Sequence, residues 1–215
     1  MKVIVFDFDG VIVPSEQTKI DGYSLIFSEF GEAVPENSII EARREFADAK
    51  GNRFDIIRSI FRRLGVTTGL EEKVAEYGQR YGKLVQERIE ALSVDAATRA
   101  TLERLASMYP LYINSNNPDE SLRETLQSLD VVKYFKAVYG SAHTKTENLK
   151  IIAKREDVKA QELLFVGDGD GDRKAAEEFG CEFIGVATDL NRWADSSNLF
   201  PVVRNVSDIT QFCKP

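Results

Sequence analysis

Two acidic stretches, far apart in the chain, carry side chains that could hold a divalent metal ion. The stretch FDFDG supplies Asp7 and Asp9 near the N-terminus. The stretch VGDGDGD supplies three aspartates at alternate positions, Asp168, Asp170 and Asp172. Carboxylate oxygens are the protein ligands that hard cations such as Mg²⁺ and Ca²⁺ prefer. The two stretches can form one metal site only if folding brings them together.

A calcium loop and a solvated turn are two other interpretations of VGDGDGD. An EF-hand loop counted from Asp168 needs glycine at its sixth position and glutamate at its twelfth, where this chain has Arg173 and Phe179. The apolar LLFV before the loop predicts a strand, whereas an EF-hand needs a helix there, so the calcium interpretation is rejected. A solvated turn would use aspartate and glycine for turn geometry alone, and it stays open for this stretch taken by itself.

Asp7 is harder to interpret as a simple surface or capping residue. It lies between Phe6 and Phe8 in an apolar run that predicts a buried strand. Burying a carboxylate is costly unless a cation or hydrogen bonds compensate its charge. Acidic clusters at the ends of two neighbouring strands would also repel each other, and a bound Mg²⁺ would remove that repulsion.

The elements that must position these residues follow from short apolar runs separated by helical patterns. Each run is nearly continuous and rich in Val, Ile, Phe and Tyr, which is typical of strands buried on both faces. The runs, of which the last is the weakest, are residues 2–8, 110–115, 136–141, 162–168, 181–187 and 201–205. The alternation with helical patterns predicts an α/β fold, a Rossmann-like parallel sheet with helices on both faces.

Residues 15–92 differ from the rest of the chain, because they show helical periodicity and no convincing strand. An all-helical segment therefore interrupts the α/β domain directly after its first strand. We expect an α/β core domain of residues 1–13 and 93–215, with an inserted helical domain of residues 14–92.

Polar residues follow four of the expected strands. Because open parallel sheets bind ligands beyond the carboxyl ends of their strands, these residues should face one crevice. Asp7 and Asp9 end the first strand, Ser115 and Asn116 end the second, and Lys145 lies in the loop after the third. The acids of VGDGDGD follow the fourth strand. The crevice would combine carboxylates, a hydroxyl and a lysine.

Composition excludes several classes of function. The net charge is −7 and no block of basic residues is present, which argues against nucleic-acid and membrane-surface partners. The N-terminus does not have the pattern of a signal peptide, and no apolar run is long enough to span a bilayer, so we expect a cytoplasmic protein. Cys181 and Cys213 have no metal-type spacing. A single histidine, His143, argues against a Ser-His-Asp triad and a multi-histidine zinc site.

Taken in order, DFDGV, INSN, a lone lysine and VGDGDGD resemble the four motifs of the haloacid dehalogenase-like (HAD) superfamily. The resemblance covers residues 1–13 and about 95–190, and the helical insertion is similar to the small helical cap of that superfamily. It implies that Asp7 is the nucleophile, which forms an aspartyl-phosphate, and that Asp9 is the acid and base. Ser115 and Lys145 would hold the transferring phosphoryl oxygens.

The resemblance also implies a Mg²⁺ site. Asp7, Asp168 and the backbone carbonyl of Asp9 would hold the ion, and Asp172 would support either the metal or Lys145. Asp170 has no family role, and we interpret it as a turn residue.

Further residues are expected to bind the substrate. Phe8, Gly10 and Asn116 are candidates near the phosphate, chiefly through backbone amides. Lys50 and Arg53, in AKGNRFD, resemble the cap loop that faces the active site in phosphoglycolate phosphatases and sugar phosphomutases. The alternative for these two is a pair of exposed basic residues at a helix start.

An acid at position 9 favours phosphate chemistry, since the dehalogenases of the superfamily lack it and need no Mg²⁺. We expect a Mg²⁺-dependent phosphatase of a small phosphorylated metabolite, with a sugar phosphate as one option, acting as a monomer or homodimer. A phosphomutase of the β-phosphoglucomutase type has the same four motifs and stays open. A non-catalytic phospho-ligand sensor is a third option. Pro14-Ser15 after the first motif and Thr-Glu after Lys145 depart from the commoner family pattern.

Overall fold

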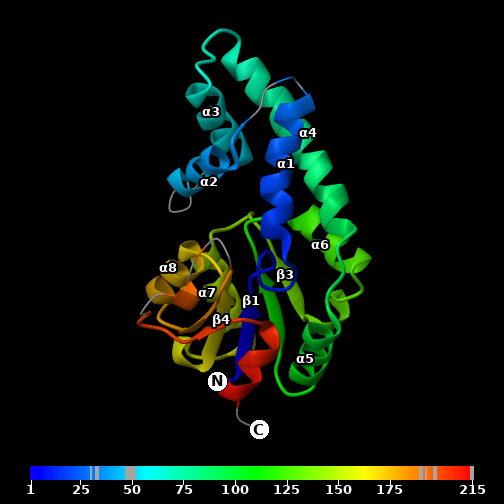
Figure 1. The fold of residues 1–215 in the computed structure, drawn as a ribbon. Helices are drawn as coiled ribbons and strands as arrows, with labels where there is room; N and C mark the ends of the chain where they lie inside the picture. The colour runs from blue at the N-terminus through cyan, green and yellow to red at the C-terminus, as the bar shows by residue number, and fades with distance from the viewer. Residues whose placement is uncertain are drawn as a thin grey trace. The chain divides into compact units, whose positions relative to one another are not determined.

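The chain divides into two compact units in the computed structural model. The first unit comprises residues 1–14 and 92–215, and the second comprises residues 15–91. Figure 1 shows a sheet in the first unit and only helices in the second. The structure describes residues 1–29, 31, 34–46, 52–188, 191, 193–195 and 198–213.

A six-stranded parallel sheet forms the centre of the first unit. Its strands have the order β3-β2-β1-β4-β5-β6, so the N-terminal strand is central. The strands are β1 (Val3–Phe6), β2 (Leu111–Asn114), β3 (Ala137–Tyr139), β4 (Leu163–Gly167), β5 (Glu182–Val186) and β6 (Val202–Val203). The prediction of a Rossmann-like parallel sheet is confirmed, and the weakest apolar run forms the shortest strand.

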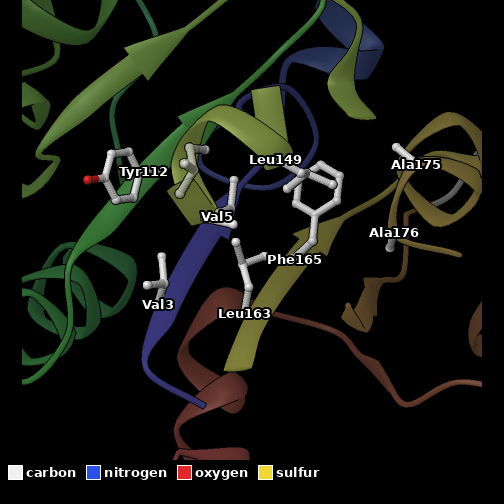
Figure 2. Close-up of a cluster of buried hydrophobic side chains, with 10 residues drawn as sticks. Val3, Val5, Tyr112, Leu149, Leu163, Phe165, Ala175 and Ala176 are labelled. Atoms are coloured by element: carbon white, nitrogen blue, oxygen red, sulfur yellow. The ribbon is translucent and has the colours of Figure 1, made fainter. Parts of the chain in front are cut away.

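Continuous apolar runs form these strands because both faces of the sheet are covered. All residues of β1, β2 and β4 are buried. Figure 2 shows the core on one face, where alternate strand residues such as Val3, Val5 and Phe165 share one buried cluster with Leu149 of α7 and Ala176 of α8. The intervening strand residues pack on the opposite face.

Helices connect the strands of the first unit: α5 (Ala96–Ala106), α6 (Asp119–Ser128), α7 (Lys145–Glu156) and α8 (Asp170–Phe179), with 3₁₀ turns η1 (Val132–Tyr134), η2 (Ala160–Glu162), η3 (Trp193–Asp195) and η4 (Val206–Phe212). Lys145 was expected in a loop, but it is the first residue of α7. Thr144 accounts for the difference, because it caps the helix in a reciprocal capping box with Glu147.

The second unit is built from α1 (Ser15–Glu29), α2 (Glu36–Glu45), α3 (Arg53–Arg63) and α4 (Leu70–Glu90). Aromatic rings fill its core. Tyr23 stacks on Tyr81 with ring centroids 4.0 Å apart, and Phe27, Phe61 and Tyr77 pack edge-on or tilted against one another. No strand occurs among the described residues of this unit. Within the described part of the chain, no helix has the length and apolar character needed to cross a membrane.

Candidate active site

The strand register brings three motifs to one edge of the sheet. Phe6 of β1 pairs with Ile113 of β2 on one side and with Val166 of β4 on the other. The residues that follow each strand, starting with Asp7 after β1, therefore leave the sheet side by side. The sequence predicted this convergence from the rule that parallel strands present their carboxyl ends together.

Asp7 is buried at this edge, with 7% of its surface exposed. Its Oδ1 accepts a hydrogen bond from the backbone N–H of Phe8 at 2.7 Å. Its Oδ2 lies 2.9 Å from Nζ of Lys145. The same Nζ lies 2.5 Å from Oδ1 of Asp172. One lysine from the start of α7, with a side chain only 9% exposed, thus joins the acids that follow β1 and β4.

The carboxylates of Asp7, Asp168 and Asp172 form a candidate metal site. One oxygen of each lies within 4.8 Å of the others. Lys145 offsets one of their three charges. An all-oxygen donor set of this charge fits Mg²⁺, which usually takes one or two carboxylates and completes its shell with phosphate and water.

The burial of the cluster changes how its groups titrate. Burial raises the pKa of Asp7 to about 7; Lys145 opposes the shift, while Asp172 and Asp9 add to it. Burial alone would lower the pKa of Lys145, but the Asp172 and Asp7 carboxylates raise it above its ordinary value. Lys145 is therefore a permanent cation, whereas Asp7 needs additional positive charge to remain fully ionised at neutral pH.

Both oxygens of Asp172 are engaged within the chain, as both oxygens of Asp7 are. Oδ1 pairs with Lys145, and Oδ2 accepts the backbone N–H of Gly169 at 3.0 Å. The contact with Lys145 fits the predicted support of that lysine, and the place of Asp172 in the acidic cluster fits the predicted support of a metal. Asp170, which we interpreted as a turn residue, instead begins α8 and pairs with Arg173 at 3.1 Å.

Two residues adjoin Asp168: Gly10 leaves room for its side chain, and Asn191 binds its backbone. Gly10 has a φ of +72°, and a Cβ there would collide with the Asp168 carboxylate. The backbone carbonyl of Asp168 accepts a hydrogen bond from Nδ2 of Asn191 at 2.9 Å, and the same amide donates to the carbonyl of Val186 at 2.8 Å. The sequence analysis missed Asn191, since a lone asparagine in a loop carries no pattern.

Asp9 is buried but its side chain is not part of the acidic group. Its Oδ2 accepts a hydrogen bond from Nδ2 of Asn117 at 2.7 Å. Ser115, also buried, accepts the backbone N–H of Asn117 at its Oγ, 3.3 Å away. Asn117 is a second residue that sequence reasoning missed, although it directly follows the predicted Ser115 and Asn116.

Two buried asparagines, Asn114 and Asn148, hold the backbone at Lys145. Nδ2 of Asn114 donates to the backbone carbonyl of Lys145 at 3.0 Å, and Nδ2 of Asn148 donates to Oδ1 of Asn114 at 2.9 Å. Asn148 also donates to the carbonyl of Gly140 at 3.1 Å. These bonds fix the start of α7 to the end of β2. Neither asparagine was predicted as a site residue.

The residues that were expected to bind the substrate contact different neighbours. The amide of Phe8 donates to Asp7, the amide of Gly10 donates to the carbonyl of Val13, and the Asn116 side chain is exposed. In the second unit, the Arg53 guanidinium lies over the ring of Phe54, and a Cβ at Gly82 would lie 3.0 Å from it. Lys50 lies outside the described residues.

Comparisons with known proteins identify similar sequences and structures. A phosphoglycolate phosphatase of Escherichia coli K12 is 29% identical over 120 residues, which cover 54% of this chain and 47% of that protein. The chain thus matches about half the length of this curated relative. A predicted phosphoglycolate phosphatase from Haemophilus somnus superposes with a TM-score of 0.78 at 19% identity, over 99% of this chain and 97% of that one.

A protein from Thermotoga maritima, provisionally designated a β-phosphoglucomutase, superposes with a TM-score of 0.75 at 19% identity, over 99% of this chain and 98% of that one. These structural likenesses show the fold. The sequence profile of the haloacid dehalogenase-like hydrolases matches residues 4–186, a range that spans both acidic stretches. The chain belongs to the haloacid dehalogenase-like hydrolase family.

Proposed function

We propose that the protein is a Mg²⁺-dependent phosphatase that hydrolyses a small phosphorylated metabolite through an aspartyl-phosphate on Asp7. The observation that carries the proposal is the buried cluster in which Asp7 shares Lys145 with Asp172 and lies beside Asp168. A buried carboxylate with a fixed cation next to it suits nucleophilic attack on a phosphate monoester.

The reaction would proceed in two half-reactions. A carboxylate oxygen of Asp7 forms a bond to phosphorus while the bond to the leaving oxygen breaks, and Asp9 gives that oxygen its proton. Asp9 then takes a proton from water, the water oxygen attacks phosphorus, and the bond to Asp7 breaks to release inorganic phosphate. Lys145, and Ser115 as its proposed companion, would neutralise and bind the phosphoryl oxygens.

Mg²⁺ would be held by Asp7, Asp168 and the backbone carbonyl of Asp9, as the family resemblance implies. When bound, the ion supplies charge neutralisation that lets a dianionic phosphate approach a carboxylate. The protein residues provide the rest: Asp172 keeps Lys145 in place, and Gly10 leaves room for Asp168.

A generic substrate tests the proposal. The purified chain should hydrolyse 4-nitrophenyl phosphate in the presence of Mg²⁺, and EDTA should abolish the activity. Asp7→Asn, which keeps the shape of the side chain but not its nucleophilic oxygen, should eliminate turnover. Undiminished activity in Asp7→Asn would show that the nucleophile is misassigned.

The substrate class is proposed from the relatives and from the second unit. Phosphoglycolate and sugar phosphates belong in the first panel of metabolites, because phosphoglycolate phosphatases are among the relatives. We propose residues 15–91 as the cap that selects the substrate, with Arg53 and Lys50 as contacts for its non-reacting end. Arg53→Ala should lower kcat/KM on the best metabolite of the panel. An unchanged kcat/KM would remove Arg53 from the site.

A further inference from the structure

We propose that Asn117 positions Asp9 for proton transfer. The inference rests on the proposed phosphatase function, and it assigns a role to a residue outside the four motifs. Nδ2 of Asn117 donates to Oδ2 of Asp9 at 2.7 Å across 108 positions of sequence. Asp9 is buried, and Asn117 is half-buried. A short hydrogen bond in such a setting restricts the orientation of the carboxyl group.

The backbone of Asn117 is fixed independently of its side chain. Its N–H donates to Oγ of Ser115 at 3.3 Å, and its carbonyl accepts the N–H of Ser141 at 2.9 Å. Pro118 follows and leads into α6. The side chain of Asp119 accepts the N–H of Gly140 at 3.0 Å, which ties the same two loops together again. Removing the Asn117 side chain therefore leaves the loop that carries it held in place.

The backbone of Asp9 is held by its own hydrogen bonds, so the bond from Asn117 acts on the side chain alone. Asp9 lies in a tight turn in which the N–H of Ile12 donates to the carbonyl of Phe8 at 2.8 Å, and that of Gly10 to the carbonyl of Val13 at 2.8 Å. An amide N–H can only donate, so Oδ2 offers it a lone pair. This hydrogen bond orients the carboxyl group that gives the proton to the leaving group and later takes one from water.

The demand for that proton depends on the leaving group. 4-Nitrophenolate is a stable anion and departs without protonation, whereas phenolate, with a pKa of about 10 for its acid, gains more from a general acid. A residue that acts through Asp9 should therefore discriminate between the two aryl phosphates. A residue that merely supports the fold should affect both equally.

The test compares kcat/KM of Asn117→Ala on phenyl phosphate and on 4-nitrophenyl phosphate. We expect a loss of roughly 10- to 100-fold on phenyl phosphate and less than about threefold on 4-nitrophenyl phosphate. Because Asp9 also activates water, the variant should release a burst of nitrophenol before a slower steady state. Asn117→Leu, of similar size but without the amide donor, should behave alike, and it provides a second variant if the first fails to fold.

Two comparisons make the result specific. Asn205→Ala removes an exposed asparagine of the same unit and should leave kcat/KM on both substrates unchanged. In Asp9→Asn, adding Asn117→Ala should cause no further loss on phenyl phosphate, because the pathway through Asp9 is already gone.

Equal losses on both substrates, or losses that multiply in the double variant, would overturn the role of Asn117 while leaving the phosphatase proposal intact. A wild-type chain without Mg²⁺-dependent activity on either aryl phosphate would instead overturn the proposed function and this inference with it.

Discussion

At the scale of single residues, the site depends on charged side chains that are held by contacts within the chain. Lys145 is shared by two carboxylates, and Asp172 uses both oxygens inside the chain. Asp168 lies so close to Gly10 that no side chain fits there. Substitutions at these positions should therefore separate metal binding from internal support.

Asp168→Asn and Asp172→Asn should differ in kind. Asp168→Asn removes one charge from the proposed metal site, so the half-saturating Mg²⁺ concentration should rise about tenfold or more, with little change in melting temperature. Asp172→Asn weakens the pairing of the buried Lys145 and should lower stability by about 3 kcal/mol as well as activity. Mg²⁺ titration of activity and thermal melts followed by circular dichroism measure both. Identical profiles for the two variants would contradict the division of roles.

Gly10→Ala should damage the site through one added methyl group. The positive φ of Gly10 costs an alanine about 1–2 kcal/mol, and the new Cβ collides with the Asp168 carboxylate. We expect lower stability and a higher Mg²⁺ requirement together. Gly171→Ala, where a Cβ would meet nothing within 4 Å, is the matched control and should leave the Mg²⁺ requirement unchanged.

At the scale of elements, helix starts and loops are joined by buried side-chain amides. Asn148 on α7 and Asn114 at the end of β2 connect the first turn of α7 to the sheet. Because Lys145 is the first residue of α7, the position of its ammonium depends on this connection.

Asn148→Leu should test the connection. It leaves Oδ1 of Asn114 and the carbonyl of Gly140 without their present donor, which should cost roughly 1–3 kcal/mol of stability, and it should reduce kcat by shifting Lys145. Ile151→Ala on the exposed side of α7 serves as control, with an expected change of at most about 0.5 kcal/mol. Chemical denaturation and steady-state kinetics give both quantities. Equal effects of the two substitutions would contradict the proposed support.

At the scale of the whole molecule, each unit has its own cluster of charged side chains that are shielded from solvent at least in part. In the second unit, Glu16 pairs with Arg43 at 2.6 Å and with Lys19 at 3.2 Å. Burial by itself raises the pKa of Glu16, but Lys19 and Arg43 outweigh it and hold the pKa at about 2. A folded-state pKa below the ordinary value near 4.5 means that the pair stabilises the fold above that pH and loses its contribution as pH falls toward 2.

Glu16→Gln should therefore lower stability by about 2 kcal/mol at neutral pH and by progressively less as pH falls from 4.5 toward 2. Urea denaturation of the full chain across this range measures the difference. Glu71→Gln removes an exposed partner of Arg58 and should have a far smaller effect at every pH. A difference between wild type and Glu16→Gln that does not depend on pH would contradict the charge-based origin.

Sequence patterns could predict the sheet and most of the acidic cluster, but not the amide network. Continuous apolar runs identify strands because burial on both faces demands them, and the carboxyl-end rule then brings Asp7 and Asp168 together. Asn114, Asn117, Asn148 and Asn191 act through single contacts between distant segments. Such contacts have no period or spacing in the sequence, and they emerge only when the backbone is folded.

The start of α7 could have been predicted from the local sequence. Thr144 and Glu147 form a capping box whose spacing is readable in TKTE, and it places Lys145 inside the helix rather than in a loop. The low exposure of the Lys145 side chain was harder to predict, because a lysine among polar residues normally lies in water. Its two acidic partners, Asp7 and Asp172, make the burial possible.

The central place of β1 has a consequence for how the chain is made. β1 is synthesised before its neighbours β2 and β4, which follow more than 100 and 150 residues later. The apolar residues of nascent β1 therefore stay unpaired until β2 and β4 have been synthesised. An exposed apolar segment of this kind is a typical binding site for chaperones. Arrested chains that stop short of Gly167 should keep β1 accessible to proteases, whereas release of the full chain should protect it.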